Sequence, residues 1–412
     1  MRALALFAGL ALVGAVLITL VSFSSAPTPA PAADPSRRET ETLQERRETL
    51  QERLRRLPGD HRGWAELATH HIDQARLTGD PSAYTKAEGA LATAARIAPK
   101  DDAVLTGQAA LAAARHEFAR AAELAESAVD ANPYAAAAYG VLADARTQLG
   151  DLRAAQQAVD AMMALRPGVA AFTRASYAAE LRGDVETART YLDYAHEDAW
   201  LPADRAYARY YQGELALHEG DLETAARHYA DALSAYPAYT PALAGQAKVA
   251  ALDGRLTEAL SLYDQVVQRL PLPQYLIEQG ETRIKAGLPA DWTLLEAQRK
   301  LYEAAGVRDD LTWAEFEADH GDPKAAVRHA RAEYTRNPNL VAADALAWSL
   351  FKAGTPEKAL PYAKRATGTG WKNPLLTYHR TRIEQSLGLT KASDAHSGRG
   401  FDPGLPALAR FS

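Results

Sequence analysis

The sequence contains no cysteine among its 412 residues. This absence excludes disulfides, thiol catalysis, cysteine-ligated zinc, iron–sulfur clusters and a lipidated N-terminal cysteine. An excess of positive charge is also missing, because 46 Lys and Arg residues face 52 Asp and Glu residues. Nucleic-acid binding depends on clustered Lys and Arg, so the charge balance predicts that nucleic acid is not a partner.

The motifs that carry common catalytic chemistry are absent as well. There is no Gly-x-x-x-x-Gly-Lys phosphate loop and no Gly-x-Ser-x-Gly nucleophile elbow. His-Glu pairs occur at 116–117, 196–197 and 218–219, but no second histidine follows at the spacing of a zinc-binding helix. We therefore expect no enzymatic activity, no catalytic or metal-binding residues and no cofactor.

One long hydrophobic run is present, at the N-terminus. Arg2 precedes an uncharged run over 3–23, which as a helix of about 32 Å is long enough to cross a bilayer core. The Ser-Ser-Ala sequence at 24–26 is typical of a signal cleavage site, although Pro27 directly after it should hinder cleavage. The run predicts either an uncleaved signal anchor or a cleaved signal peptide. In both cases the remaining chain lies outside the cytoplasm, on a single-pass cell-membrane anchor or secreted.

Proline and alanine dominate the next segment, 24–38, which contains the sequence SSAPTPAPAADPS. This composition favours an extended, polyproline-like spacer over packed structure. We expect an extracytoplasmic linker that holds the rest of the chain away from the membrane.

From residue 39 onward, strong helix formers dominate and no alternating run typical of a β-strand occurs. Proline recurs every 34 residues, at Pro99, Pro133 and Pro167 and again at Pro237 and Pro271. Glycines alternate with these prolines at intervals of 33 to 37 residues: Gly150, Gly183, Gly220, Gly254, Gly287, Gly321 and Gly354. Glycine ends one helix and proline stops the next, so each period predicts a pair of antiparallel helices.

Each period also places small residues where two helices would meet. In the unit that ends at Pro271, Ala247 and Ala259 flank Gly254, and Tyr263 is placed to fill the space beside them. A 34-residue period with this pattern resembles the tetratricopeptide repeat. The resemblance covers most of the chain and implies an all-α solenoid of about nine helix pairs, in which the first helix of each pair lines a concave face.

The resemblance also implies how such an array is stabilised. Each unit buries its surface against its sequence neighbours, so we expect nearly additive stability along the array and capping segments at its ends. The solenoid domain spans 39–390 and begins with a leading half-unit at 39–58. Two segments depart from the period: 272–311, where we expect a longer second helix that includes Trp292, and an irregular C-terminal tail at 391–412.

A short heptad repeat precedes the first full unit. The heptapeptides ETLQERR and ETLQERL follow one another within 41–57 and space leucines seven residues apart. Such a seam could pair two chains into a homodimer. Two and a half heptads are few for a coiled coil, so the favoured interpretation is a capping helix that docks its leucines on Trp64 and Leu67.

Protein or peptide binding on the concave face is the function that the resemblance favours. One predicted first helix carries three tyrosines within five residues, flanked by charges of both signs. The candidate groove residues are Arg174, Tyr177, Tyr207, Tyr210, Tyr211, Glu214, His218 and Lys248. Tyrosine offers both apolar contact and a hydroxyl, so we expect the three central tyrosines to be partly exposed. The alternative is that they pack between units.

Three stretches, AYGVLADARTQLGD, PGVAAFTRASYAAELRGD and FEADHGDP, also resemble secreted or membrane-anchored actinobacterial repeat proteins of unsettled role. The asparagine-and-lysine clamp of chaperone-binding relatives is not matched, because the corresponding positions hold Asp144, Tyr177, Glu214 and Lys248. We therefore expect an extracytoplasmic, membrane-tethered interaction scaffold. The alternatives are a self-associating structural protein of the cell envelope and an envelope enzyme with its site in 272–311.

Overall fold

The computed structural model describes residues 43–390 and 400–410, and every regular element within these ranges is helical. The first part of the array comprises α2 (Leu43–Arg56), α3 (His61–Thr78), α4 (Ala83–Ile97), α5 (Asp102–Ala114), α6 (Phe118–Ala131), α7 (Ala136–Gln148), α8 (Leu152–Leu165), α9 (Val169–Glu180), α10 (Val185–Asp198), α11 (Pro202–His218) and α12 (Leu222–Ala235). The second part comprises α13 (Thr240–Leu252), α14 (Leu256–Arg269), α15 (Pro273–Lys285), α16 (Thr293–Ala304), α17 (Asp310–His320), α18 (Pro323–Arg336), α19 (Leu340–Lys352), α20 (Pro356–Ala366), α21 (Pro374–Ser386) and the 3₁₀ helix η2 (Pro406–Ala409).

These helices form nine antiparallel pairs within the described residues, from α3–α4 to α19–α20. The odd-numbered first helices also contact one another along the array, which places them on its inner side. The predicted all-α helical-repeat architecture is therefore confirmed. α2 precedes the pairs, α21 follows them, and η2 lies in the last described segment.

The helix ends follow from the punctuation within each unit. Asp151, Asp184 and Asp221 each accept a hydrogen bond from the backbone N–H of the third residue of the following helix, which is the preferred N-cap arrangement. Gly150 ends α7 with a φ of 75°, a left-handed conformation that suits glycine. In the α5–α6 turn, His116 holds the equivalent position with a φ of 60°.

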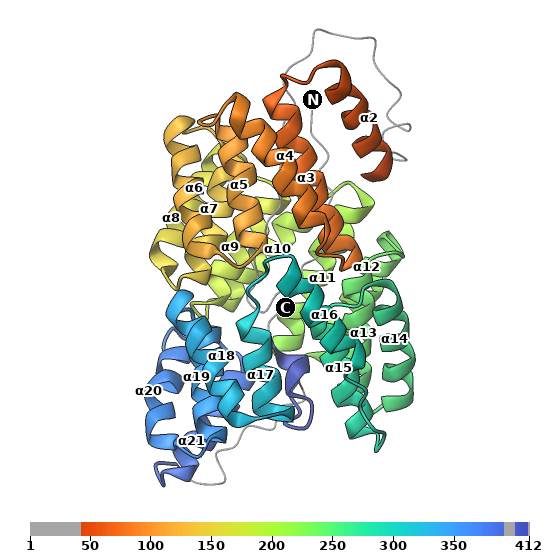
Figure 1. Ribbon diagram of the computed structural model, residues 1–412. Helices are drawn as coiled ribbons and strands as arrows, with labels where there is room; N and C mark the ends of the chain where they lie inside the picture. The colour runs from red at the N-terminus through yellow and green to blue at the C-terminus, as the bar shows by residue number, and fades with distance from the viewer. Residues whose placement is uncertain (1–42, 391–399, 411–412) are drawn as a thin grey trace.

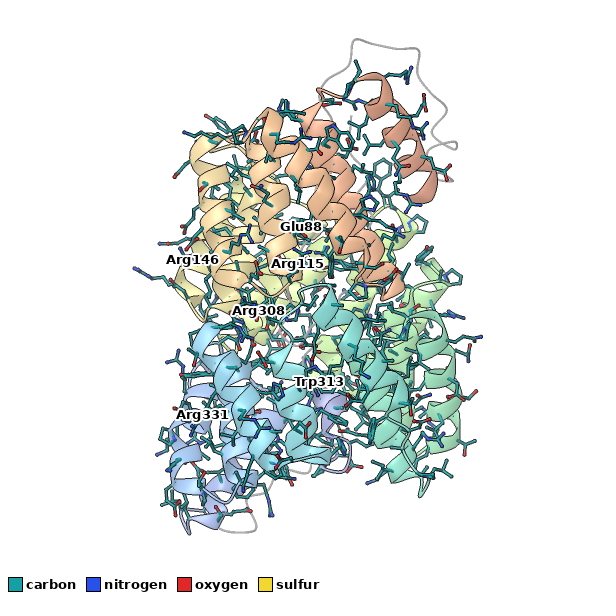
Figure 2. All side chains as sticks on the ribbon, viewed as in Figure 1. Glu88, Arg115, Arg146, Arg308, Trp313 and Arg331 are labelled. Carbon is teal, nitrogen blue, oxygen red and sulfur yellow. The ribbon has the colours of Figure 1, made fainter. Side chains whose placement is uncertain are left out.

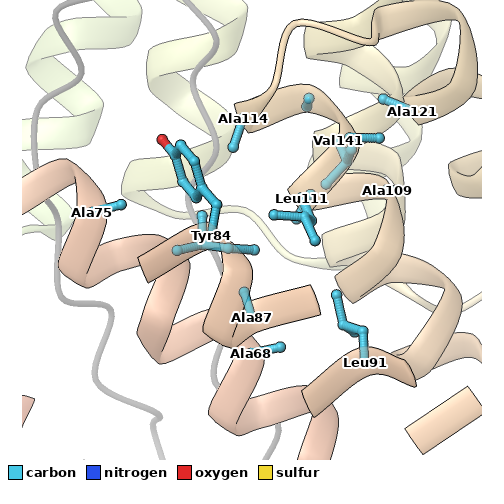
Figure 3. Packing of buried hydrophobic residues seen from close by; sticks show 14 of the residues in the cluster. Ala68, Ala75, Tyr84, Ala87, Leu91, Ala109, Leu111, Ala114, Ala121 and Val141 are labelled. Carbon is cyan, nitrogen blue, oxygen red and sulfur yellow. The ribbon is translucent and has the colours of Figure 1, made fainter. Parts of the chain in front are cut away.

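The space between paired helices is filled by one large side chain among small ones. In the α3–α5 region, Tyr84 and Leu91 of α4 lie among Ala68, Ala87 and Leu111 (Figure 3). Cores built this way tolerate little change in volume. The small residues that define the sequence pattern are therefore the ones that allow the helices to approach.

The same device recurs between units, where glycine admits an aromatic ring. A Cβ atom added to Gly213 of α11 or to Gly245 of α13 would lie 2.5 Å from the ring of Tyr229. Tyr229 itself is fully buried. This ring therefore fixes the distance between two neighbouring first helices.

The array winds into a superhelix whose second turn stacks on its first. Figure 1 shows the red-to-yellow helices above the teal and blue ones. Asn339 donates hydrogen bonds of 3.0 Å to the main-chain and side-chain oxygens of Gln148, 191 residues earlier. Trp371 likewise approaches Glu180 at the same sequence separation. One superhelical turn therefore takes between five and six 34-residue periods.

Glycine also allows the two turns of the superhelix to touch. A Cβ atom at Gly150 would overlap the backbone of Pro338, and one at Gly183 would overlap the backbone of Gly370. Gly254 has a similar φ, but nothing lies within 4 Å of its Cβ position. The expectation that each unit packs only on its sequence neighbours is therefore wrong, because units one superhelical turn apart are also in contact.

The segment 272–311 is one of the places where the second turn meets the first. The ring of Trp292 fills the space above Gly280, where a Cβ would overlap it. α16 begins after Trp292, at Thr293, and is no longer than its counterparts, so the expected longer helix is wrong. The backbone N–H of Arg308 donates to the carbonyl of Arg115 at 3.2 Å, and Figure 2 shows these residues where the two turns meet.

The leading helix α2 docks on the first full unit. Leu50 and Leu54 are buried in one cluster with Leu67, and Trp64 packs against this cluster. These contacts agree with a capping role, and a homodimer through 41–57 stays a prediction. The expected membrane segment at 3–23 and the linker at 24–38 lie outside the described residues. Among the helices that the structure describes, none combines the length and hydropathy needed to cross a bilayer.

Candidate protein-binding face

The candidate groove residues lie on the inner sides of three successive first helices. Those on α9, α11 and α13, in that order, are Arg174 and Tyr177, then Tyr207, Tyr210, Tyr211, Glu214 and His218, then Lys248. The expectation of partial exposure is wrong for Tyr207 and Tyr210, which are each 3% exposed. Tyr211 is half-buried. Whether these residues bind a partner stays a prediction.

The three tyrosines pack against other aromatic rings. The Tyr210 ring centroid lies 5.1 Å from that of Tyr211, 5.9 Å from that of Tyr239 and 6.0 Å from that of Tyr229. Tyr207 contacts Tyr211 edge-to-face at 4.8 Å. Such edge-to-face pairs add stability beyond area burial. The tight curvature of the superhelix brings these inner faces together, so the tyrosines form core contacts.

The charged candidates are matched by internal partners. Glu214 accepts a 2.6 Å hydrogen bond from the Tyr229 hydroxyl and lies 3.3 Å from the Lys248 ammonium. Lys248 also lies 3.7 Å from Glu278 of α15. Burial acts to lower the pKa of Lys248, but the Glu214 and Glu278 carboxylates outweigh it and raise that pKa. A fully buried ammonium is therefore kept charged by two neighbouring units.

Arg174 and His218 are paired in the same way. Arg174 donates from Nε and Nη2 to both oxygens of Asp144 on α7, at 2.9 and 2.7 Å. His218 Nδ1 lies 3.0 Å from Glu180, which also accepts from Trp371 of the second turn. Between α7 and α13, polar side chains on the inner face therefore link neighbouring units and neighbouring turns.

The inner face of the second turn holds a different kind of partner, the segment 400–410. In Figure 1 this dark blue piece of chain lies between α17 and α15. Leu405 and Leu408 join a cluster of alanines on α13, and the Phe401 ring lies 5.3 Å from that of Tyr378 on α21. The segment therefore crosses several first helices on their concave side.

Arg410, the cationic side chain of this segment, enters a pocket on α17. Its Nη2 lies 2.6 Å from Asp319 and its Nε 3.2 Å from Glu315, while Nη2 also approaches the Glu315 carbonyl at 3.4 Å. Burial, and after it the Asp344 and Asp319 carboxylates, raise the pKa of Glu315 to about 8 against the opposing effect of Arg410. The guanidinium therefore offsets part of a concentrated negative charge.

Two further carboxylates complete what we call the acidic pocket: Glu281, Glu315, Asp319 and Asp344. Glu281 of α15 accepts the backbone N–H of Ala407 at 2.8 Å and lies 2.9 Å from His320. Asp344 of α19 lies 2.7 Å from Nδ1 of His379. The described residues contain no group of acidic and histidine side chains placed to hold a metal ion.

Sequence reasoning missed the acidic pocket, although a signal for it was present. Glu281 and Glu315 stand one 34-residue period apart, as do Glu214 and Lys248. Side chains one period apart occupy equivalent positions on neighbouring first helices. An acidic residue that recurs with the period is therefore a sign of a charged inner surface.

The similarities to other proteins concern the repeat architecture. No family model matches the sequence, and no curated protein matches it. Solved structures that are similar include PilF of Pseudomonas aeruginosa, with 14% identity over 56% of this chain and 97% of that chain, and a TM-score of 0.39. YrrB, described as a TPR protein with an unusual peptide-binding site, has 18% identity over 51% of this chain and 97% of its own, with a TM-score of 0.30.

A human IFIT1 dimer with m7Gppp-AAAA is also similar, with 14% identity over 79% of this chain and 77% of that chain, and a TM-score of 0.48. YrrB and a protein from Parabacteroides merdae are described as tetratricopeptide-repeat proteins. The predicted resemblance to such proteins is confirmed at the level of the repeat architecture, because the described residues form a regular series of antiparallel helix pairs. The likeness to an actinobacterial group stays a prediction.

Proposed function

We propose that this protein is an interaction scaffold whose repeat array binds a peptide or a protein segment on its inner face. The observation that carries the proposal is the segment 400–410, which lies across α13, α15, α17 and α21 without forming a helix pair of its own. The inner face of the second turn thus accommodates a peptide-like segment. Helical-repeat arrays use such concave surfaces for binding.

The scaffold acts outside the cytoplasm, tethered through 3–23 or released after cleavage. The uncharged run of that segment supports this location because it is long enough for a membrane span. A reporter that is active only outside the cytoplasm, fused after Ser36, should be active. Activity of a cytoplasm-only reporter at the same junction would contradict the location, and the intact mass of the mature chain separates anchor from cleaved signal.

Site-specific crosslinking in intact cells tests the binding face. A photo-reactive phenylalanine analogue at Tyr378, which is half-buried on the inner side of α21, should capture a defined partner that mass spectrometry identifies. The same analogue at Tyr194, an exposed tyrosine on the outer helix α10, is the matched control. Identical captures at both positions would show that the inner face is not the binding surface.

A further inference from the structure

The segment 400–410 is anchored in two parts on either side of an exposed turn. Phe401 is buried in the first part, and Leu405, Leu408 and Arg410 are buried in the second together with Ala407 and Ala409, whereas Pro403 and Gly404 between the two parts are exposed. One backbone group near its end, the N–H of Ala407, is held by a carboxylate. Residues 406–409 form the short 3₁₀ helix η2. Buried anchor side chains of this kind are how a short peptide docks in a groove.

The surface that contacts the segment has an apolar part, which holds its leucines, and a charged part, which holds its arginine. The two leucines contact alanines of α13 and the ring of Tyr263, which is fully buried. Arg410 enters the acidic pocket, where it meets Glu315 and Asp319. A planar guanidinium suits carboxylates better than an ammonium does, because it presents several donors in a fixed geometry.

One edge of the segment is open to solvent. A cavity of about 890 Å³ is lined on one side by Phe401, Asp402 and Pro403. On the other side it is lined by residues of α12 and α13, of the turn that precedes α12 and of the turn that follows α13. Gly400 approaches Gly220 closely on that side, so the segment enters the inner face beside this opening. An incoming chain can therefore reach the first anchor without disturbing any helix pair.

We propose that the segment 400–410 is a displaceable internal ligand, and that the external partner is a peptide with the same chemistry: leucine anchors followed by an arginine that enters the acidic pocket. The proposal rests on the scaffold function and adds its regulation. While the segment is bound, the site is closed to partners. Because the segment is tethered to α21, its effective concentration at the site is high, and only a tightly binding or concentrated partner displaces it.

A synthetic peptide tests the proposal on the full chain. The probe is a fluorescently labelled GFDPGLPALAR, the sequence of 400–410. The double variant Leu405→Asp/Leu408→Asp weakens the internal segment and should bind the probe saturably, at least tenfold more tightly than the unaltered chain does. The double variant Leu301→Asp/Leu389→Asp makes the same chemical change at exposed leucines and should behave like the unaltered chain.

The arginine is tested through the probe itself. A peptide that ends in alanine instead of arginine should bind the Leu405→Asp/Leu408→Asp variant at least tenfold more weakly, and one that ends in lysine should fall between them. Equal binding of all three peptides would overturn the assignment of the acidic pocket. A folded double variant that binds no peptide would overturn the whole proposal, because the segment would then be a fixed cap.

Hydrogen exchange on the unaltered chain covers the case in which that variant does not fold. The amides of Ala407 and Leu408 should exchange at least tenfold faster than the central amides of α13, because the segment leaves without unfolding of the array. Equal rates would mean that the segment leaves only on global unfolding, and the proposal would be wrong. Partner capture at Tyr378 together with failure of the peptide tests would retain the scaffold and reject only its internal ligand.

Discussion

Tyr210 is a single side chain that contributes to stability where the inner faces of neighbouring first helices meet. Its ring meets three other tyrosine rings from α11, α12 and the residue before α13. Burial raises its pKa well above the ordinary value, so the hydroxyl stays protonated at any physiological pH. The side chain therefore acts through packing.

Replacement of Tyr210 by alanine should destabilise the protein by about 3–5 kcal/mol, because it removes a buried aromatic ring and leaves a cavity. Urea unfolding followed by circular dichroism measures this loss. Tyr194→Ala is the control, since that tyrosine is exposed on α10 and should cost well under 1 kcal/mol. If Tyr210→Ala were as stable as the control, Tyr210 would not be a core residue and would again be a candidate for exposed partner binding.

Asp204 on α11 is a buried carboxylate whose Oδ1 has no hydrogen-bond partner. Burial, and after it the Asp198 carboxylate, raise its pKa to about 8 from an ordinary 3.8. A pKa raised on folding gives stability that is complete at low pH and is lost as the pH rises from about 4 through about 8. Full ionisation of this group costs on the order of 6 kcal/mol, because each pKa unit corresponds to about 1.4 kcal/mol.

Asp204→Asn removes that dependence and should be increasingly more stable than the unaltered protein between pH 5 and pH 8. Melting temperatures across this range measure the difference. Asp130→Asn changes an exposed aspartate of α6 and should shift the melting temperature little at any pH. A constant difference for Asp204→Asn at all pH values would mean that Asp204 is already ionised at pH 5.

At this scale, the sequence could predict proximity but not exposure. Glu214 and Lys248 stand one period apart, so their approach follows directly from the repeat. Their burial depends on the curvature of the superhelix. That curvature is the sum of small rotations between successive units, and no single residue determines it. The position of Arg410 could not be predicted for a different reason. The segment 400–410 lacks the 34-residue pattern, so nothing in the sequence relates it to a helix of the array.

The turn between the two helices of a pair has two roles: it ends the first helix, and in the first superhelical turn it also contacts the second superhelical turn. The recurring glycines predict where each first helix ends, because only glycine takes a left-handed conformation without strain. The same glycines in the first superhelical turn also lie against the backbone of the second. The 34-residue period reveals that glycine is needed to end a helix. The need for glycine where the two turns touch depends on residues nearly 190 positions away, which the period does not reveal.

Gly183→Ala and Gly254→Ala separate these two requirements. Their φ values of 76° and 77° impose the same conformational cost, about 1–2 kcal/mol for a residue with a Cβ. Only Gly183 faces another backbone, that of Gly370, so Gly183→Ala should cost at least 1–2 kcal/mol more, as overpacking does. Equal losses in urea unfolding would show that the turns of the superhelix separate at little cost.

For the whole molecule, contact between turns changes the expected folding behaviour. An open solenoid transmits a perturbation only to neighbouring units. Here Asn339 reaches Gln148, Trp371 reaches Glu180, and Arg308 reaches the carbonyl of Arg115. The first and second superhelical turns are thus joined by direct contacts. Local opening in one turn therefore exposes surface on the other.

Hydrogen exchange on a Gln148→Ala variant tests this coupling. The substitution removes the side-chain acceptor for Asn339, which also caps α19 through the N–H of Ala342. Amides of α19 should therefore exchange several-fold faster, although they lie 191 residues or more along the chain, and amides of α7 should be affected as well. Gln265→Ala, at an exposed glutamine that bonds only to its own helix, should change exchange near α14 alone. If the effect of Gln148→Ala stayed within α6 to α9, the array would behave as an open solenoid, because stacking between its turns would then contribute no measurable protection.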